Sequence, residues 1–100
     1  KTLGYRVMKM KIGYGAEVDL EIVKAVRNAV GPTTGLAVDA NCAYDAGTAA
    51  WLGRQLEPYG LLWWEEPLLA NDLEGYARLR QAFAIPLASG ESMAADDLIT

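Results

Sequence analysis

The sequence predicts an α/β fold made of tandem strand–helix units, and three observations lead to this prediction. Four short apolar segments each precede a stretch with helical periodicity. Polar residues close these segments at intervals of 28, 26 and 26 residues, counted from Lys11 through Asp39 and Glu65 to Glu91. The segments are almost continuously apolar, as strands buried on both faces are. Parallel strands joined by crossover helices account for all three observations.

Such units occur both in (β/α)8 barrels and in open doubly wound sheets. We favour the barrel, because each strand end contributes a polar residue and barrels build their sites from several successive strand ends. An open sheet gathers its ligands at one switch point instead. Since a complete barrel needs about 250 residues, we expect residues 1–100 to be the first half of a catalytic barrel domain, about four βα units. The later strands and a capping domain would lie outside this sequence.

The first unit is predicted to contain a strand over residues 5–12 and a helix that ends at Gly31-Pro32. The strand is short and mostly apolar, and glycines follow it. Alternation along a strand places Lys9 and Lys11 on one face. The helix is predicted from apolar residues spaced along one helical face, namely Val18, Ile22, Ala25, Val26 and Ala29.

The second unit begins with a strand over residues 36–39 that ends in Asp39. Extending the strand alternation places Asn41 on the same side as this acid. Asp45 is a suitable N-cap for the next helix, because its side chain can accept a hydrogen bond from the first turn. This helix is predicted to stop at Pro58 and to bury Ala49, Leu52 and Leu56.

The third and fourth units repeat the pattern. Residues 61–65 form the third strand, which ends at Glu65 and is broken by Pro67. Asn71 or Asp72 caps the next helix, which is predicted to bury Tyr76, Leu79 and Phe83. A fourth strand over residues 85–88 continues to Glu91, and a fourth helix is expected near residues 96–97.

Composition limits the classes of partner. The net charge is −4, the pI is about 4.6 and there is no basic run, which argues against nucleic acid and anionic membranes. No apolar run approaches the roughly 18 residues that span a bilayer, and the first residues lack a signal-peptide layout. We therefore expect a soluble, cytoplasmic protein with a small-molecule partner. Cys42 has no second thiol, and the absence of histidine excludes a histidine-based triad within this sequence.

Three acids are candidate metal ligands. Asp39, Glu65 and Glu91 would converge at the barrel mouth if their parallel strands lie about 4.8 Å apart. Carboxylates packed so closely raise one another's pKa, and a hard divalent cation relieves the repulsion. Mg²⁺ fits best, because it accepts a few carboxylates and keeps positions open for water or substrate. The alternative is that each acid caps a helix or is simply solvated.

Two lysines on one strand face form a second candidate group. The ammonium groups of Lys9 and Lys11 repel, so the neutral form of each is easier to reach, and a lysine in this state can act as a base. Lys11 lies nearer the strand end and is the better candidate for proton transfer, with Lys9 pairing with a substrate anion. Base and metal together suit removal of the proton beside a carboxylate, because the metal stabilises the enediolate charge that develops.

Four motifs carry a family resemblance across nearly the whole sequence. They are the Lys-x-Lys strand at residues 7–13 and the acidic strand ends at residues 38–41, 64–67 and 89–91. Together they resemble the barrel of the enolase superfamily, in its mandelate racemase-like branch. The resemblance implies Mg²⁺ on Asp39, Glu65 and Glu91, with Lys11 as the acid/base catalyst. Asn41 and Glu66 are expected to support the metal or the substrate.

The resemblance implies a magnesium-dependent dehydratase, cycloisomerase or racemase that acts on a small hydroxy-acid or sugar-acid carboxylate, and a homo-oligomeric full-length protein. Two rival functions remain at this point. One is an aldolase-like barrel enzyme in which Lys9 or Lys11 forms a Schiff base. The other is a half barrel without activity, and we expect the 100-residue segment alone to be inactive.

Overall fold

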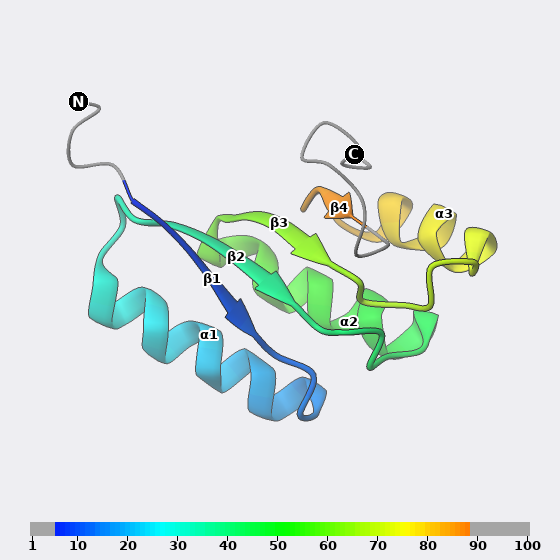
Figure 1. Ribbon diagram of the computed structural model, residues 1–100, viewed down its shortest axis with the longest axis horizontal. Coiled ribbons are helices and arrows are strands. Elements are labelled where there is room, and N and C mark those ends of the chain that lie inside the picture. The colour runs from blue at the N-terminus through cyan, green and yellow to red at the C-terminus, as the bar shows by residue number, and fades with distance from the viewer. Residues whose placement is uncertain (1–5, 89–100) are drawn as a thin grey trace.

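A computed structural model describes residues 6–88 as a parallel sheet with helices along it (Figure 1). The elements in chain order are β1 (Val7–Lys11), α1 (Ala16–Val30), β2 (Gly35–Asp39), α2 (Ala46–Leu56), the 3-10 turn η1 (Glu57–Tyr59), β3 (Leu61–Glu65), α3 (Leu73–Ala82) and β4 (Leu87–Ala88). The predicted order of strands and helices is thus confirmed over these residues. Glu91 and the helix expected near residues 96–97 lie outside the described residues.

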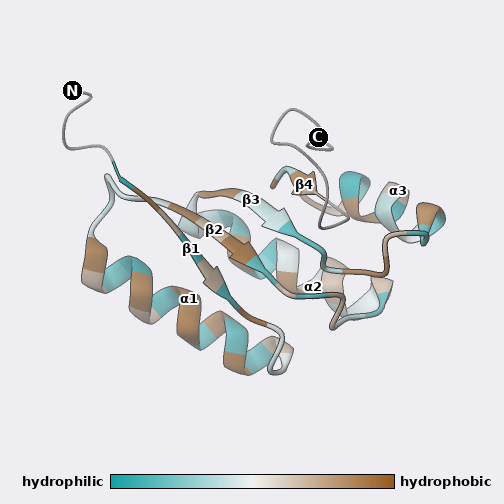
Figure 2. Ribbon diagram, in the orientation of Figure 1, coloured by the Kyte–Doolittle hydropathy of each residue, from teal (hydrophilic) through white to brown (hydrophobic). Residues whose placement is uncertain are grey.

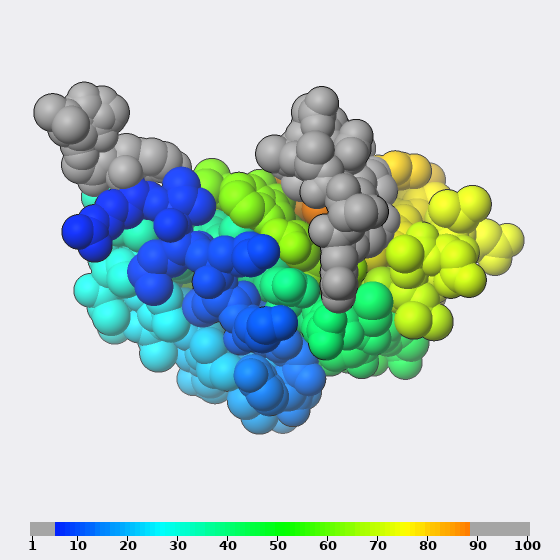
Figure 3. Space-filling model, in the orientation of Figure 1, coloured from blue at the N-terminus to red at the C-terminus, as the bar shows by residue number. Residues whose placement is uncertain are grey.

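The four strands are parallel and lie side by side in chain order, β1-β2-β3-β4. Right-handed crossovers between neighbours in this order place all the intervening helices on one face of the sheet. Helix α2 accordingly packs between α1 and α3. In the space-filling view, β1 and the start of α1 (blue) lie at one side of the molecule and α3 (yellow) at the other (Figure 3).

Strand register aligns the predicted strand ends with one exception. Lys11 pairs with Asp39 and Asp39 pairs with Glu65. The register partner of Glu65 in β4 is Ala88, three positions before Glu91. The third interval of 26 residues is therefore not a strand-to-strand register. The third unit is shorter because α3 has 10 residues, whereas α1 has 15.

A one-residue offset interrupts the pairing of β2 with β3. Leu36 pairs with Leu61, but the next residue of β2, Ala37, pairs with Trp63. Leu62 is therefore an extra residue in β3, as in a β-bulge. Beyond it, Trp64 faces the helices while Trp63 and Glu65 share the face of Lys9 and Lys11.

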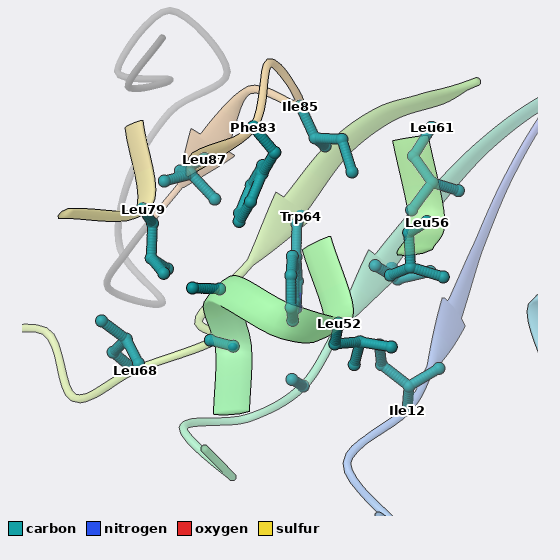
Figure 4. Close-up of a cluster of buried hydrophobic side chains, with 14 of the residues drawn as sticks. Ile12, Leu52, Leu56, Leu61, Trp64, Leu68, Leu79, Phe83, Ile85 and Leu87 are labelled. Atoms are coloured by element: carbon teal, nitrogen blue, oxygen red, sulfur yellow. The ribbon is translucent and has the colours of Figure 1, made fainter. Parts of the chain in front are cut away.

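Trp64 lies at the centre of the core between the sheet and the helices (Figure 4). Its ring stacks on Phe83 with centroids 5.8 Å apart and meets Tyr44 edge to face at 6.5 Å. Gly53 of α2 lies directly against the Phe83 ring, which leaves no room for a Cβ. The helical residues predicted to be buried in α2 and α3 are buried: Ala49, Leu52, Leu56, Tyr76, Leu79 and Phe83.

The helix boundaries follow the predicted capping residues. Asp45 caps α2 by accepting a hydrogen bond from the backbone N–H of Thr48 at 2.8 Å. Asp72, one of the two residues proposed for α3, accepts from the backbone N–H of Gly75 at 2.9 Å. Pro58 lies in η1, directly after α2. Over residues 6–88, the helices are too short or too polar to cross a membrane.

The predicted buried stripe of α1 is largely wrong. Val18 is 52% exposed, and Ala25 and Ala29 are exposed as well. Of the predicted stripe, Val26 packs against the core, beside Leu20 and Val30, and the fully buried residues of the helix are Val23 and Asp19. Apolar residues occur on more than one side of α1 (Figure 2), so spacing alone does not identify the side that faces the sheet.

Candidate active site

Asp39 and Glu65 are the last residues of β2 and β3, and the sheet register places them directly beside each other. Neighbouring strands lie about 4.8 Å apart, and paired residues of parallel strands point to the same face. The two carboxylates therefore project together from the end of the sheet. The backbone N–H of Asn41 donates to Asp39 Oδ1 at 3.0 Å, which fixes the orientation of this side chain.

Sharp left-handed turns follow both acids. Asn41, Cys42 and Glu66 have φ values of 54°, 64° and 51°, a region that residues other than glycine adopt uncommonly. Backbone hydrogen bonds hold the turns in place, from Cys42 N to Glu66 O at 2.6 Å and from Glu66 N to Ala88 O at 2.7 Å. Strand alternation therefore ends at Asp39. The assumption that it extends to Asn41 is wrong.

The two adjacent acids at the end of β3, Glu65 and Glu66, have different surroundings. The side chain of Glu65 is 26% exposed on the face it shares with Lys9, whereas Glu66 is only 6% exposed and lies in the turn. Glu65 is therefore the more accessible of the two acids, and the assignment of Glu65 as a ligand and of Glu66 as a supporting residue stays a prediction.

Glu65 accepts two hydrogen bonds on the same oxygen. Lys9 Nζ lies 3.1 Å and Trp63 Nε1 lies 2.9 Å from Glu65 Oε1. Burial raises the pKa of Glu65, but the hydrogen bonds from Trp63 and Lys9 and the charges of Lys9 and Lys11 outweigh burial, so the pKa is below its ordinary value. Glu65 is therefore a carboxylate at neutral pH.

The two lysines differ in their contacts. Lys9 is register partner to Ala37, whose small side chain lies between Lys9 and Trp63, and it forms an ion pair with Glu65. Lys11 is exposed beside Asp39, and within residues 6–88 it has no ion-pair partner. Both side chains are exposed, so the two lysines differ in that Lys9 is engaged in an ion pair and Lys11, within these residues, is not.

A buried acid that the sequence analysis missed lies beside this site. Asp19 is 0% exposed and accepts hydrogen bonds from Gly13 N at 2.8 Å, from Tyr14 N at 3.1 Å and from the hydroxyl of Tyr44. The backbone N–H of Gly15 donates in turn to the Tyr44 hydroxyl at 3.2 Å. Burial, and then the hydrogen bond and charge of Asp19, raise the pKa of Tyr44. The feature of the sequence that could have identified Asp19 is its position as an acid in the first helical turn after a glycine-rich loop.

This cluster ties the loop after Lys11 to the loop after Asp39. The two loops touch at Gly13, which has a φ of 113°, and a Cβ there would lie 2.7 Å from the carbonyl oxygen of Ala40. Only glycine fits such a contact without displacement of the backbone. The strand ends that carry Lys11 and Asp39 are thereby held at a fixed spacing.

The donor set suits a hard divalent cation. Asp39 and Glu65 offer carboxylate oxygens, which Mg²⁺ prefers, and the sequence has no histidine to favour a softer metal. In the part of the chain that the structure describes, no three acidic, cysteine or histidine side chains are grouped as a complete metal site. Glu91, the third predicted ligand, lies outside that part.

Comparisons with known proteins match the chain to one family model and to several curated relatives. A family model described as "Enolase C-terminal domain-like" matches residues 1–96. The chain is 43% identical over 89 residues to D-galactarolactone cycloisomerase from Agrobacterium fabrum, covering 89% of this chain and 24% of that protein. It is 42% identical over 87 residues to L-talarate/galactarate dehydratase from Salmonella typhimurium, covering 86% and 22%. Other relatives are named as epimerases and racemases.

Solved structures agree with these relatives. The crystal structure of 3,6-anhydro-D-galactonate cycloisomerase from Zobellia galactanivorans matches with a TM-score of 0.84 and 42% identity, over 90% of this chain and 26% of that one. L-Talarate dehydratase from Polaromonas sp. JS666, complexed with Mg and L-glucarate, matches with a TM-score of 0.81 and 43% identity, over 88% and 25%. The chain thus spans about a quarter of these relatives. The predicted barrel fold class is confirmed, and magnesium, the predicted metal, is bound in the matching L-talarate dehydratase structure.

Proposed function

The chain belongs to the enolase C-terminal domain-like family, in its mandelate racemase-like branch, and from this premise we propose that the full-length protein removes the proton α to a carboxylate with the help of Mg²⁺. Residues 1–100 would supply the first half of the catalytic barrel. The later strands and a capping domain would complete the site.

The observation that carries this proposal is the alignment of Lys11, Asp39 and Glu65 at the ends of three adjacent strands. In our proposal Asp39, Glu65 and Glu91 hold the metal. Bound there, Mg²⁺ would supply positive charge that stabilises a substrate carboxylate as it gains negative charge.

Lys11 is the proposed base. Its amine is exposed beside Asp39, so a substrate carboxylate held near the two acids would present its α-carbon within reach of Lys11 Nζ. Lys11 would accept the proton in its neutral form and carry it as an ammonium ion. Lys9, which pairs with Glu65, would add positive charge on the same face.

We propose a sugar acid as the substrate and dehydration or cycloisomerisation as the outcome. Two of the matching relatives are named as a D-galactarolactone cycloisomerase and an L-talarate/galactarate dehydratase, and both names describe hydroxylated acids. The protein would then be a lyase or an isomerase, and its partner a small hydroxylated carboxylate. Racemisation shares the same first step and is the second candidate outcome.

Exchange of the substrate α-proton tests this function. A panel of sugar acids is incubated in D₂O with the full-length protein and Mg²⁺, and deuterium incorporation is followed by NMR. We expect incorporation to stop with EDTA, and to fall by about 100-fold or more in Lys11→Met, because general-base catalysis typically contributes that much.

Lys24→Met is the matched control. Lys24 lies on α1 in a pair with Glu21, and its replacement should leave exchange unchanged. Exchange that persists in EDTA, together with borohydride trapping of a substrate–lysine adduct, would instead support the Schiff-base enzyme.

A further inference from the structure

We infer that Trp63 is a positioning residue for the magnesium site, and that Trp63 and Lys9 influence metal affinity in opposite directions through one oxygen of Glu65. This inference rests on the proposed function, because it assumes that Glu65 is a metal ligand.

The contact geometry identifies Trp63. It lies two residues before Glu65 in β3, so both side chains project from the same face. Its indole N–H donates to Glu65 Oε1 at 2.9 Å, and the ring is partly buried. A tryptophan has only two side-chain torsions, so a packed ring holds its donor at a fixed point.

The neighbouring Trp64 shows that this bond is particular to Trp63. Trp64 is fully buried against Tyr44 and Phe83. Within the described residues its indole N–H has no hydrogen-bond partner. A tryptophan can therefore pack in this core without a hydrogen bond from its indole N–H. The hydrogen bond from Trp63 to Glu65 is thus not a requirement of packing alone.

Both donors act on Glu65 Oε1, and they differ in charge. Fixing one oxygen restricts the orientation of the carboxylate and leaves Oε2 outside these two hydrogen bonds, on the residue that is the register partner of Asp39. Outer hydrogen-bond partners that orient a ligand generally strengthen metal binding. The neutral indole orients Glu65 without repelling a cation, whereas the ammonium of Lys9 places a like charge beside the metal.

Calorimetric titration of the full-length protein with MgCl₂ tests the inference. We expect Trp63→Phe to weaken Mg²⁺ binding by about 10-fold, the lower end of the effect of lost outer-shell partners. Lys9→Met should bind Mg²⁺ more tightly than the wild type, because the like charge beside the metal is removed. Trp51→Phe is the control, since Trp51 is exposed on α2, and its affinity should equal that of the wild type.

A second variant separates the hydrogen bond from packing. Replacing Trp63 with β-(3-benzothienyl)alanine exchanges the N–H for sulfur and retains the ring shape, so it should weaken Mg²⁺ binding as Trp63→Phe does without lowering the melting temperature. Wild-type affinity in this variant, or unchanged or weaker binding in Lys9→Met, would overturn the inference alone. Absence of Mg²⁺ binding by the wild-type protein would overturn the proposed function and the inference with it.

Discussion

Two carboxylates near the candidate site, Asp19 in α1 and Glu65 at the end of β3, have opposite surroundings. Asp19 is fully buried and accepts three hydrogen bonds, which occupy both of its oxygens. Glu65 remains 26% exposed and accepts two hydrogen bonds, both on Oε1. The first acid is saturated by the protein, whereas the second keeps one oxygen directed away from these donors.

This difference indicates that Asp19 stabilises the fold, whereas Glu65 is available to a ligand. A buried carboxylate is tolerated when donors compensate for its lost hydration, and Asp19 meets that condition with two backbone N–H groups and a tyrosine. Glu65 is oriented but not enclosed. Substitutions at the two sites should therefore affect different properties of the protein.

The largest expected effect is the loss of metal affinity in Glu65→Gln. Removing a ligand charge should weaken Mg²⁺ binding by about 100-fold or more, beyond the range for supporting residues, with little change in stability. Glu66→Gln is the matched control, since the two acids are adjacent and Glu66 lies buried in the turn. Titration calorimetry measures both variants, and equal losses would mean that Glu65 is not the ligand of the pair.

The next effect concerns stability. Asp19→Ala should lower the free energy of unfolding by about 3 kcal/mol, because three hydrogen bonds of roughly 1 kcal/mol each are lost. Urea unfolding of the full-length protein measures this change. Glu17→Ala removes an exposed acid from the same helical turn and should change stability by less than about 0.5 kcal/mol. A strong loss of Mg²⁺ affinity in Asp19→Ala without a loss of stability would contradict the division of roles.

The smallest effect is a change in the pH dependence of stability. Because the pKa of Tyr44 is raised above its ordinary value of 10.0, the folded state retains a proton that the unfolded chain loses. The stabilisation is complete below about pH 10 and decreases as the pH rises further. Between pH 10 and 11, the wild-type protein should lose at most about 1.4 kcal/mol more than Tyr44→Phe. The free energy of unfolding is measured with urea at each pH. An equal decrease between pH 10 and 11 in the wild type and in Tyr44→Phe would show that Tyr44 ionises freely in the folded state.

Much of the site could be predicted from strand ends. Lys11, Asp39 and Glu65 each close an apolar segment, and parallel pairing necessarily brings such residues to one edge of the sheet. Their alignment depends only on local pattern and on the direction of the strands. The same reasoning found the caps Asp45 and Asp72, whose hydrogen bonds are formed within four residues.

Features that depend on contacts between distant segments were not predictable in this way. Asp19 differs from a solvated helix-start acid only because Tyr44, 25 residues away, meets it in the fold. The pairing of Glu65 with Ala88 depends on the length of α3 and the loops around it. The buried side of α1 is selected by the sheet against which it packs, since apolar residues occur on more than one side.

The extra residue in β3 makes the length of this strand as important as its composition. Side chains alternate with a period of two, so one inserted residue reverses the orientation of every side chain after it. If Leu62 were instead paired with Ala37 as a regular strand residue, Trp64 would lie beside Asp39 and Glu65 would turn toward the helices. The bulge at Leu62 therefore decides which side chains of β3 face the core and which face the site, so alignments of β3 must respect its phase.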